Sequence, residues 1–173
     1  MKDTKISIAL TRLCNFSRCY AVGATNYEDV LGISSTNDPK SLLEQLSIAH
    51  LVLSKIEKLC SVHHLAMLKF RYGFSDHFGD DVSLGILAEL VYSTNSDIGR
   101  YIVINWRSGT RAGVTLAATY GIHERTSRRL VSKSKEKLDN QLLKFHSDLD
   151  LQIKALLIEY GLYNNLAKPF SLD

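Results

Sequence analysis

The stretch LAATYGIHERTSRRLV, from Leu116 to Val131, has the pattern of two helices joined by a tight turn. Such a pair needs a small residue where the helices pack closely, a turn residue that adopts a left-handed conformation, and apolar residues at fixed positions. Ala117 is the small residue and Gly121 is the turn residue. Ser127 stands where a branched apolar residue is commoner. We therefore expect the two helices to pack less tightly there, without a change in their register. The apolar packing positions are Leu116, Tyr120, Ile122 and Leu130.

This frame is that of a helix-turn-helix, and it places the start of the second helix near His123. The start of such a helix meets base edges in the major groove of DNA, where Arg can bind guanine through two hydrogen bonds and Glu can accept one from cytosine. Lys135 and Lys137 lie further along, where phosphate contacts are more natural. The predicted DNA-binding residues are His123, Glu124, Arg125, Arg128, Arg129, Ser132, Lys133, Lys135, Lys137 and Arg111.

The charge of the chain is unevenly distributed. The region from Asn105 to Lys137 holds eight Lys or Arg residues against two Glu residues, whereas the whole chain has a net charge of only +3. A basic block within an otherwise slightly acidic protein is typical of polyanion binding. A solvated helix face can have the same composition, so the charge favours DNA only together with the helix-turn-helix frame.

A second copy of the frame lies 29 residues earlier, in LAELVYSTNSDIGRYI, from Leu87 to Ile102. Ala88 aligns with Ala117, and Tyr92 occupies the turn position in place of glycine. The copy is either a second DNA-reading unit or a helical pair that supports the basic one. We favour support, because a face with one arginine neutralises few phosphates. That face comprises Thr94, Asn95, Ser96, Gly99 and Arg100.

Apolar residues elsewhere recur at helical spacing, and the chain contains only two prolines, which predicts an all-α helical bundle. We expect helices over about residues 4–20, 39–61 and 62–72, with loops over 23–38 and 73–81. Ser147 and Asp150 suggest the start of a separate final helix. The predicted domains are an N-terminal helical region, residues 1–76, and a helix-turn-helix region with C-terminal helices, residues 80–173.

Several classes of protein are disfavoured. The sequence has no phosphate-binding glycine loop, no HExxH motif and no clustered carboxylates at catalytic spacing, so we expect no enzyme, no cofactor and no metal. The adjacent His63 and His64 point to different helix faces, which favours a structural or solvent role. Three cysteines without a CxxC pair favour a reducing cytoplasm. No segment is long and apolar enough to predict a membrane span.

The segment from Gly109 through Leu116, Ala117, Tyr120 and Gly121, the arginine-rich stretch, and Lys135 to Leu138 resembles the DNA-binding helices of the fourth region of sigma factors. It also resembles the Q-type late antiterminators of lambdoid phages. The resemblance covers roughly residues 82–143. It implies a phage or prophage regulator that binds promoter-proximal double-stranded DNA and engages RNA polymerase.

Two questions about partners stay open. A helical protein-interaction adaptor, whose basic helix meets an acidic partner, is the alternative to a DNA-binding regulator. The apolar stripe near the C-terminus, with Leu149, Ile153, Leu156, Leu157 and Tyr160, either folds back on the core or forms a homodimer with a second copy of the chain.

Overall fold

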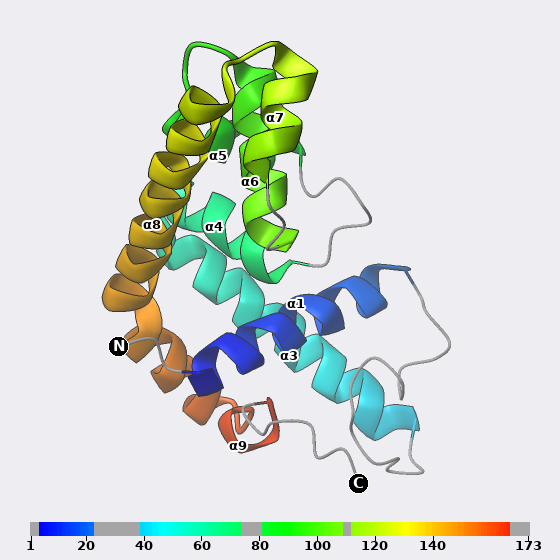
Figure 1. The fold of residues 1–173 in the computed structure, drawn as a ribbon. Helices are drawn as coiled ribbons and strands as arrows, with labels where there is room; N and C mark the ends of the chain where they lie inside the picture. Colours follow the sequence, from blue (N-terminus) through cyan, green and yellow to red (C-terminus); the bar gives the residue numbers. More distant parts are fainter. Residues whose placement is uncertain (1–3, 23–38, 74–80, 109–111, 167–173) are drawn as a thin grey trace, which may run out of the picture. The chain divides into compact units, whose positions relative to one another are not determined.

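The computed structural model describes residues 4–22, 39–73, 81–108 and 112–166, which form helices and no strand. The predicted all-α class is therefore confirmed for these residues. Of the predicted loops over residues 23–38 and 73–81, residues 23–38 and 74–80 lie outside the described residues, whereas Asp81 begins a helix. The helices are α1 (Thr4–Val22), α3 (Pro39–Leu59), α4 (Val62–Tyr72), α5 (Asp81–Val91), α6 (Ser96–Ser108), α7 (Ala112–Tyr120), α8 (Glu124–Glu159) and α9 (Tyr163–Leu166) (Figure 1).

The first helices follow the predicted bounds because their apolar residues recur every three or four positions. In α1, Ile6, Leu10 and Leu13 are buried at this spacing. In α3, Leu46, Val52 and Ile56 are buried on one face in the same way. Helix α4 begins and ends where the sequence predicts, at Val62 and Tyr72.

The chain divides into two compact units, which we call the first and the second unit. The first unit comprises residues 1–60, 72–74 and 146–173, so it contains α1, α3, α9 and the end of α8. Arg12 Nη1 in α1 donates a hydrogen bond of 3.3 Å to the backbone oxygen of Leu166 in α9. Lys55 Nζ in α3 donates to the Tyr160 hydroxyl and lies 4.6 Å from the centre of its ring. These contacts, with the buried Ile153 and Leu157, join the C-terminal segment to the first helices.

The second unit comprises residues 61–71 and 75–145, so it contains most of α4, all of α5, α6 and α7, and the start of α8. The largest buried side chains here include Phe70 in α4, Leu87 in α5, Ile102 in α6 and Phe145 in α8. His64 is buried, and its ring meets that of Phe145 edge to face at 5.8 Å. This contact supports the structural role predicted for His64.

The predicted start of a final helix at Ser147 is wrong, because α8 continues without a break to Glu159. The segment contains no proline or glycine, so nothing in it interrupts the helix. The helix is capped by Gly161, two residues beyond its end, which has a φ of 68°. Gly161 N donates to Ile158 O at 3.0 Å and Leu162 N donates to Leu157 O at 2.8 Å, which is the hydrogen-bond pattern of a Schellman cap.

The two units also divide the chain differently from the predicted domains. Residues 146–166 were predicted to belong with the helix-turn-helix region, but they lie in the same unit as α1 and α3. The predicted apolar stripe of the C-terminal segment folds back on the core, because Leu149, Ile153 and Leu157 are buried and Leu156 and Tyr160 are half-buried. Leu151 and Ile158, which lie outside the stripe, are exposed.

Candidate nucleic-acid interface

Helices α7 and α8 are joined at Gly121, which has a φ of 64°. This value confirms the predicted left-handed conformation, which glycine adopts at little cost. The side chains at the predicted packing positions share one core cluster with α6. Leu116 is fully buried in the cluster, together with Ile98, Ile102 and Val131; Tyr120, Ile122 and Leu130 pack against these residues from the edge.

Ser127 is fully buried, and its hydroxyl explains why a polar residue is tolerated there. Ser127 Oγ donates a hydrogen bond of 2.6 Å to the backbone oxygen of Gly113 in α7. A Cβ on Gly113 would lie only 3.0 Å from Cγ of Arg128. The two helices thus approach closely at Gly113, and the small serine with its hydrogen bond replaces the apolar contact that a branched residue would make.

The first turn of α8 is capped by a side chain that the sequence assigned to DNA contact. His123 Nδ1 accepts a hydrogen bond of 3.3 Å from the backbone N–H of Arg125. This satisfies one of the N–H groups that a helix start leaves without an intrahelical partner. Glu124 forms an ion pair with Arg128 one turn later, at a surface position. The two residues therefore hold each other at the start of the helix.

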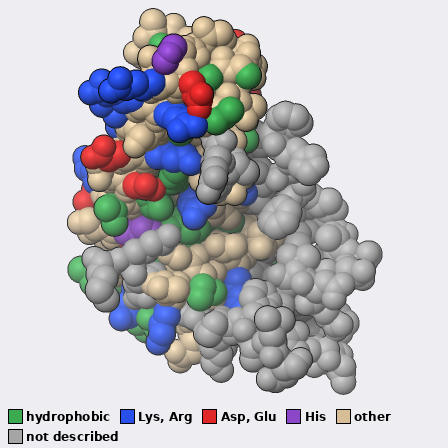
Figure 2. Space-filling model, viewed as in Figure 1, with side chains coloured by type: hydrophobic (Ala, Val, Ile, Leu, Met, Phe, Trp, Pro, Cys, Tyr) green, Lys and Arg blue, Asp and Glu red, His purple; other side chains and the backbone are tan. Residues whose placement is uncertain are grey.

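The other predicted DNA-binding residues of α8 are well placed to meet a ligand. Arg125, Arg129, Ser132, Lys133 and Lys137 are exposed, as are His123, Glu124 and Arg128, whereas Lys135 is half-buried. Arg111 lies outside the described residues. Figure 2 shows Lys and Arg side chains gathered along the first half of α8, interrupted by a few acidic ones.

These cations occupy the centre and both edges of the exposed side of α8. Successive helical residues advance by about 100°, so Arg125 and Arg129 face away from the buried residues, while Arg128 and Lys135 share one edge and Lys137 lies on the other. A helix in the major groove has a phosphate backbone on each side. Cations on both edges therefore suit such a position.

The earlier copy of the frame, α5 and α6, uses its polar residues differently. Asn95 Oδ1 accepts hydrogen bonds from Asp97 N at 3.0 Å and Ile98 N at 3.2 Å, so Asn95 caps α6. A Cβ on Gly99 would lie 2.6 Å from the backbone oxygen of Ala88, so the two helices touch there. Arg100 forms an ion pair with Asp81. Three residues of the predicted reading face, Asn95, Gly99 and Arg100, thus make contacts within the second unit.

The sequence did not point to a second group of cations in this unit, which lies on α4 and α6. Cζ of Arg71 lies 5.4 Å from the centre of the Trp106 ring, and Cζ of Arg107 lies 5.4 Å from the centre of the Phe70 ring. Trp106 is half-buried and its Nε1 donates a hydrogen bond of 2.9 Å to Asp139 Oδ1 in α8. These contacts give Trp106 a structural role between α4, α6 and α8. No local pattern joins Arg71 to residues 35 positions away.

The first unit contains a buried polar chain that involves a histidine. His146 Nδ1 lies 2.7 Å from Asp150 Oδ1, and His146 Nε2 lies 2.6 Å from the Tyr72 hydroxyl. A carboxylate only accepts, so Nδ1 carries the proton and Nε2 can accept the hydroxyl hydrogen of Tyr72. Tyr72 and His146 are 5% and 4% exposed, which leaves no room for a substrate. We assign this chain of hydrogen bonds to stability.

Other site types receive no support from the residues that the structure describes. Among these residues, no cluster of His, Cys, Asp and Glu could hold a metal ion. Burial raises the pKa of Cys14 to about 12 and that of Cys60 to about 11, which disfavours the reactive thiolate at neutral pH. None of the described helices meets the length and hydropathy needed to cross a bilayer.

Comparisons of the chain with models of protein families, with curated proteins and with solved structures gave no match.

Proposed function

We propose that the chain is a sequence-specific DNA-binding transcription regulator in which α7 and α8 form a helix-turn-helix. The observation that carries the proposal is the exposed row of cations on α8, directly after the left-handed turn at Gly121. Arg125, Arg128 and Arg129 lie within the first two turns, where a recognition helix reads bases. Lys133 and Lys137 follow on the same exposed side, where they are suited to phosphates.

The packing of the two helices supports this reading over that of an ordinary hairpin. Leu116 and Val131 join α7 and α8 to the same core cluster as α6, which fixes the start of α8 against α6 and α7. A reading helix requires such support, because base contacts depend on side chains held in a defined position. The alternative, a protein-interaction adaptor, accounts for the basic charge of α8. It gives no reason for the glycine turn that precedes α8.

The resemblance to sigma factors and Q-type antiterminators extends the proposal to a phage or prophage regulator, acting in the cytoplasm with RNA polymerase. The resemblance is supported by the match of the α7 and α8 residues to the helix-turn-helix frame. It therefore concerns only the proposed DNA-binding part of the chain. A second copy of the chain would bind through exposed apolar residues of α8. Leu151 is 84% exposed and Ile158 is 56% exposed.

The test is selection of duplexes from a random DNA pool by the purified full chain, followed by sequencing and by affinity measurements at several salt concentrations. We expect an enriched motif and an affinity that falls steeply with salt. A palindromic motif would indicate a two-fold dimer, and an asymmetric motif would indicate a monomer. Failure to enrich any motif, with no salt-dependent retention on duplex DNA, would overturn the proposal in favour of the adaptor.

A further inference from the structure

Two arginines in the second unit are held in a reciprocal arrangement between α4 and α6. Arg71 of α4 lies over Trp106 of α6, and Arg107 of α6 lies over Phe70 of α4. Each guanidinium is thus held by an aromatic ring of the other helix. Both arginines are half-buried, so part of each side chain remains accessible. A cation over an aromatic face loses little of its charge to the ring and keeps its N–H groups available at the edge.

The two guanidinium groups are close enough to influence each other. Burial, followed by the positive charge of Arg71, lowers the pKa of Arg107. A guanidinium nevertheless stays protonated at neutral pH, so the two positive charges remain. Among the described residues, Arg71 forms no ion pair with a carboxylate. An anion bound beside the pair would therefore reduce their repulsion.

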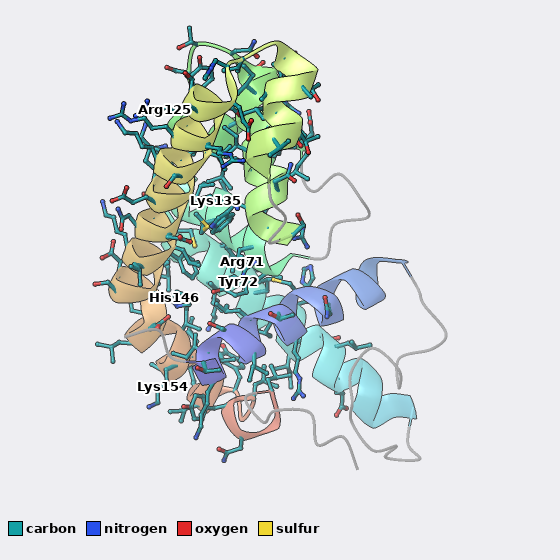
Figure 3. All side chains as sticks on the ribbon, in the orientation of Figure 1. Arg71, Tyr72, Arg125, Lys135, His146 and Lys154 are labelled. Atoms are coloured by element: carbon teal, nitrogen blue, oxygen red, sulfur yellow. The ribbon has the colours of Figure 1, made fainter. Side chains whose placement is uncertain are left out.

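This cluster adjoins the cationic edge of α8. Trp106 Nε1 donates to Asp139 of α8, and Lys135 lies one turn before Asp139 on the same face. Arg128 lies two turns before Lys135, along the same edge. Figure 3 shows Lys135 on the flank of α8 nearer to Arg71, whereas Arg125 points outward. The edge of α8 thus leads from the predicted reading residues to the cluster on α4 and α6.

We propose that Arg71, Arg107 and Lys135 form a second phosphate-binding patch, which extends the DNA interface beyond the first turns of α8. The patch rests on the proposed function, because its ligand is the backbone of the same duplex. Planar guanidinium groups bind phosphate oxygens through paired hydrogen bonds. Lys135 lies ten residues after Arg125, or roughly 15 Å along the helix, so the patch meets phosphates other than those beside Arg125.

Asp139 gives the patch a built-in opposing charge. Its carboxylate accepts the indole hydrogen of Trp106, the ring over which Arg71 lies, and so places one negative charge beside the patch. An asparagine would retain an oxygen that accepts this hydrogen bond and would remove the charge. Asp139→Asn should therefore strengthen DNA binding while leaving the local contact in place. A misfolded protein would lose affinity for DNA. A gain in affinity of the Asp139→Asn variant therefore cannot be explained by misfolding.

The experiment measures fluorescence anisotropy of the full chain with two probes, a duplex selected by the wild-type protein and an unrelated duplex of equal length. Phosphate contacts do not depend on sequence, so Arg71→Gln should lower affinity by the same factor on both probes. We expect a loss of roughly three- to tenfold and a decrease in salt slope of about 0.9. Arg71→Lys retains the charge and should restore most of the affinity.

Two matched controls belong to the first unit. Lys154 Nζ lies 5.4 Å from the centre of the Tyr163 ring, so Lys154→Gln also removes a cation from an aromatic face. Asp148→Asn removes an exposed negative charge from α8, as Asp139→Asn does. Both controls should bind DNA as the wild type does. Asp139→Asn should raise the affinity at least twofold to threefold on both probes, as expected for loss of a charge that repels phosphate.

The outcomes separate the patch from the proposed function. If Arg125→Ala weakens binding to the selected duplex while Arg71→Gln and Asp139→Asn match their controls, the patch is wrong and the reading helix stands. If Arg71→Gln affects only the selected duplex, Arg71 contacts bases and the phosphate assignment is wrong. If the wild-type chain binds neither duplex, the proposed function fails and the patch fails with it.

Discussion

At the scale of single residues, Arg125 and Arg128 are both exposed at the start of α8 but have different surroundings. Glu124 holds the Arg128 guanidinium, and Cγ of Arg128 packs near Gly113. The backbone N–H of Arg125 donates to His123, while the Arg125 side chain extends into solvent. The Arg128 side chain is thus oriented in the chain alone, whereas Arg125 would become ordered only in the proposed complex with DNA, at a cost in side-chain entropy.

We expect Arg125→Ala and Arg128→Ala each to weaken binding to the selected duplex by roughly 1 to 3 kcal/mol, the usual range for a good base contact. Helical circular dichroism should not change, because both side chains are exposed. Lys58→Ala, an exposed position on α3 in the first unit, is the control. Unchanged affinity for both arginine variants at one fixed salt concentration would remove them from the interface.

The thiol of Cys14 predicts how stability depends on pH. Burial, followed by the charge of Glu57, raises its pKa from 9.0 to about 12. In the unfolded chain the thiol ionises near 9.0, whereas the folded chain keeps it protonated to about pH 12. This contribution to stability is therefore complete below pH 9 and is lost as pH rises towards 12.

The measurement is urea unfolding of the wild type and of Cys14→Ala, in reductant, at pH 8 and at pH 10.5. The free energy of unfolding of the wild type should fall by about 1 to 2 kcal/mol more than that of the variant. Other groups that titrate in this range are present in both chains and cancel. A difference in stability between the two proteins that does not change with pH would contradict the assignment.

At the scale of the helices, local sequence patterns predicted the features that depend on neighbouring residues. They did not predict the contacts between segments far apart in the sequence. The left-handed turn at Gly121 and the burial of Leu116 follow from the spacing of residues 116–131, so the sequence predicted both. The hydrogen bond from Ser127 to Gly113 was missed because it depends on how closely α7 and α8 approach. The cluster around Arg71 was missed for a similar reason, because it exists only where α4 and α6 meet.

The turn itself can be tested with a matched pair of glycines. Gly121 and Gly161 both have positive φ, of 64° and 68°, and a Cβ on either would meet no atom within 4 Å. Valine at each position should therefore cost about 1 to 2 kcal/mol through backbone strain alone. Thermal melting should show both losses.

The two variants should differ in DNA binding. Gly121→Val disturbs the start of α8 and should lower affinity for the selected duplex, whereas Gly161→Val lies in the first unit and should not. Gly121→Asn should retain more stability than Gly121→Val, because asparagine tolerates the left-handed region better. A Gly121→Val protein that melts and binds as the wild type does would mean that the helix-turn-helix frame is misplaced.

At the scale of the whole molecule, every described residue of the proposed interface belongs to the second unit. The first unit is closed by contacts between segments far apart in sequence, such as Arg12 with Leu166 and Tyr72 with His146. Helical periodicity predicts which residues are buried but not which helix covers them. This is why the sequence predicted α1 and α3 of the first unit and yet assigned the end of α8 to a different domain.

Whether the proposed DNA interface has one reading head or two depends on the earlier copy of the frame, α5 and α6. Arg100 is already paired with Asp81, and Asp97 adds a second negative charge that acts on it. This face can neutralise few phosphates, and affinity for duplex DNA grows with the number neutralised. We therefore expect one reading head per chain, with α5 and α6 as its support.

The test compares a double variant, Arg100→Ala with Asn95→Ser, with Arg128→Ala on the selected duplex. Serine is used because Asn95 caps α6 and serine also caps helices, whereas alanine would lower stability by about 1 kcal/mol. The double variant should match the wild type in affinity, salt slope and base preference, whereas Arg128→Ala should not. A loss as large as that of Arg128→Ala, confined to a separate set of base pairs, would show that each chain reads DNA with both copies. The selected motif would then contain two different half-sites for a single chain, rather than one half-site or a palindrome.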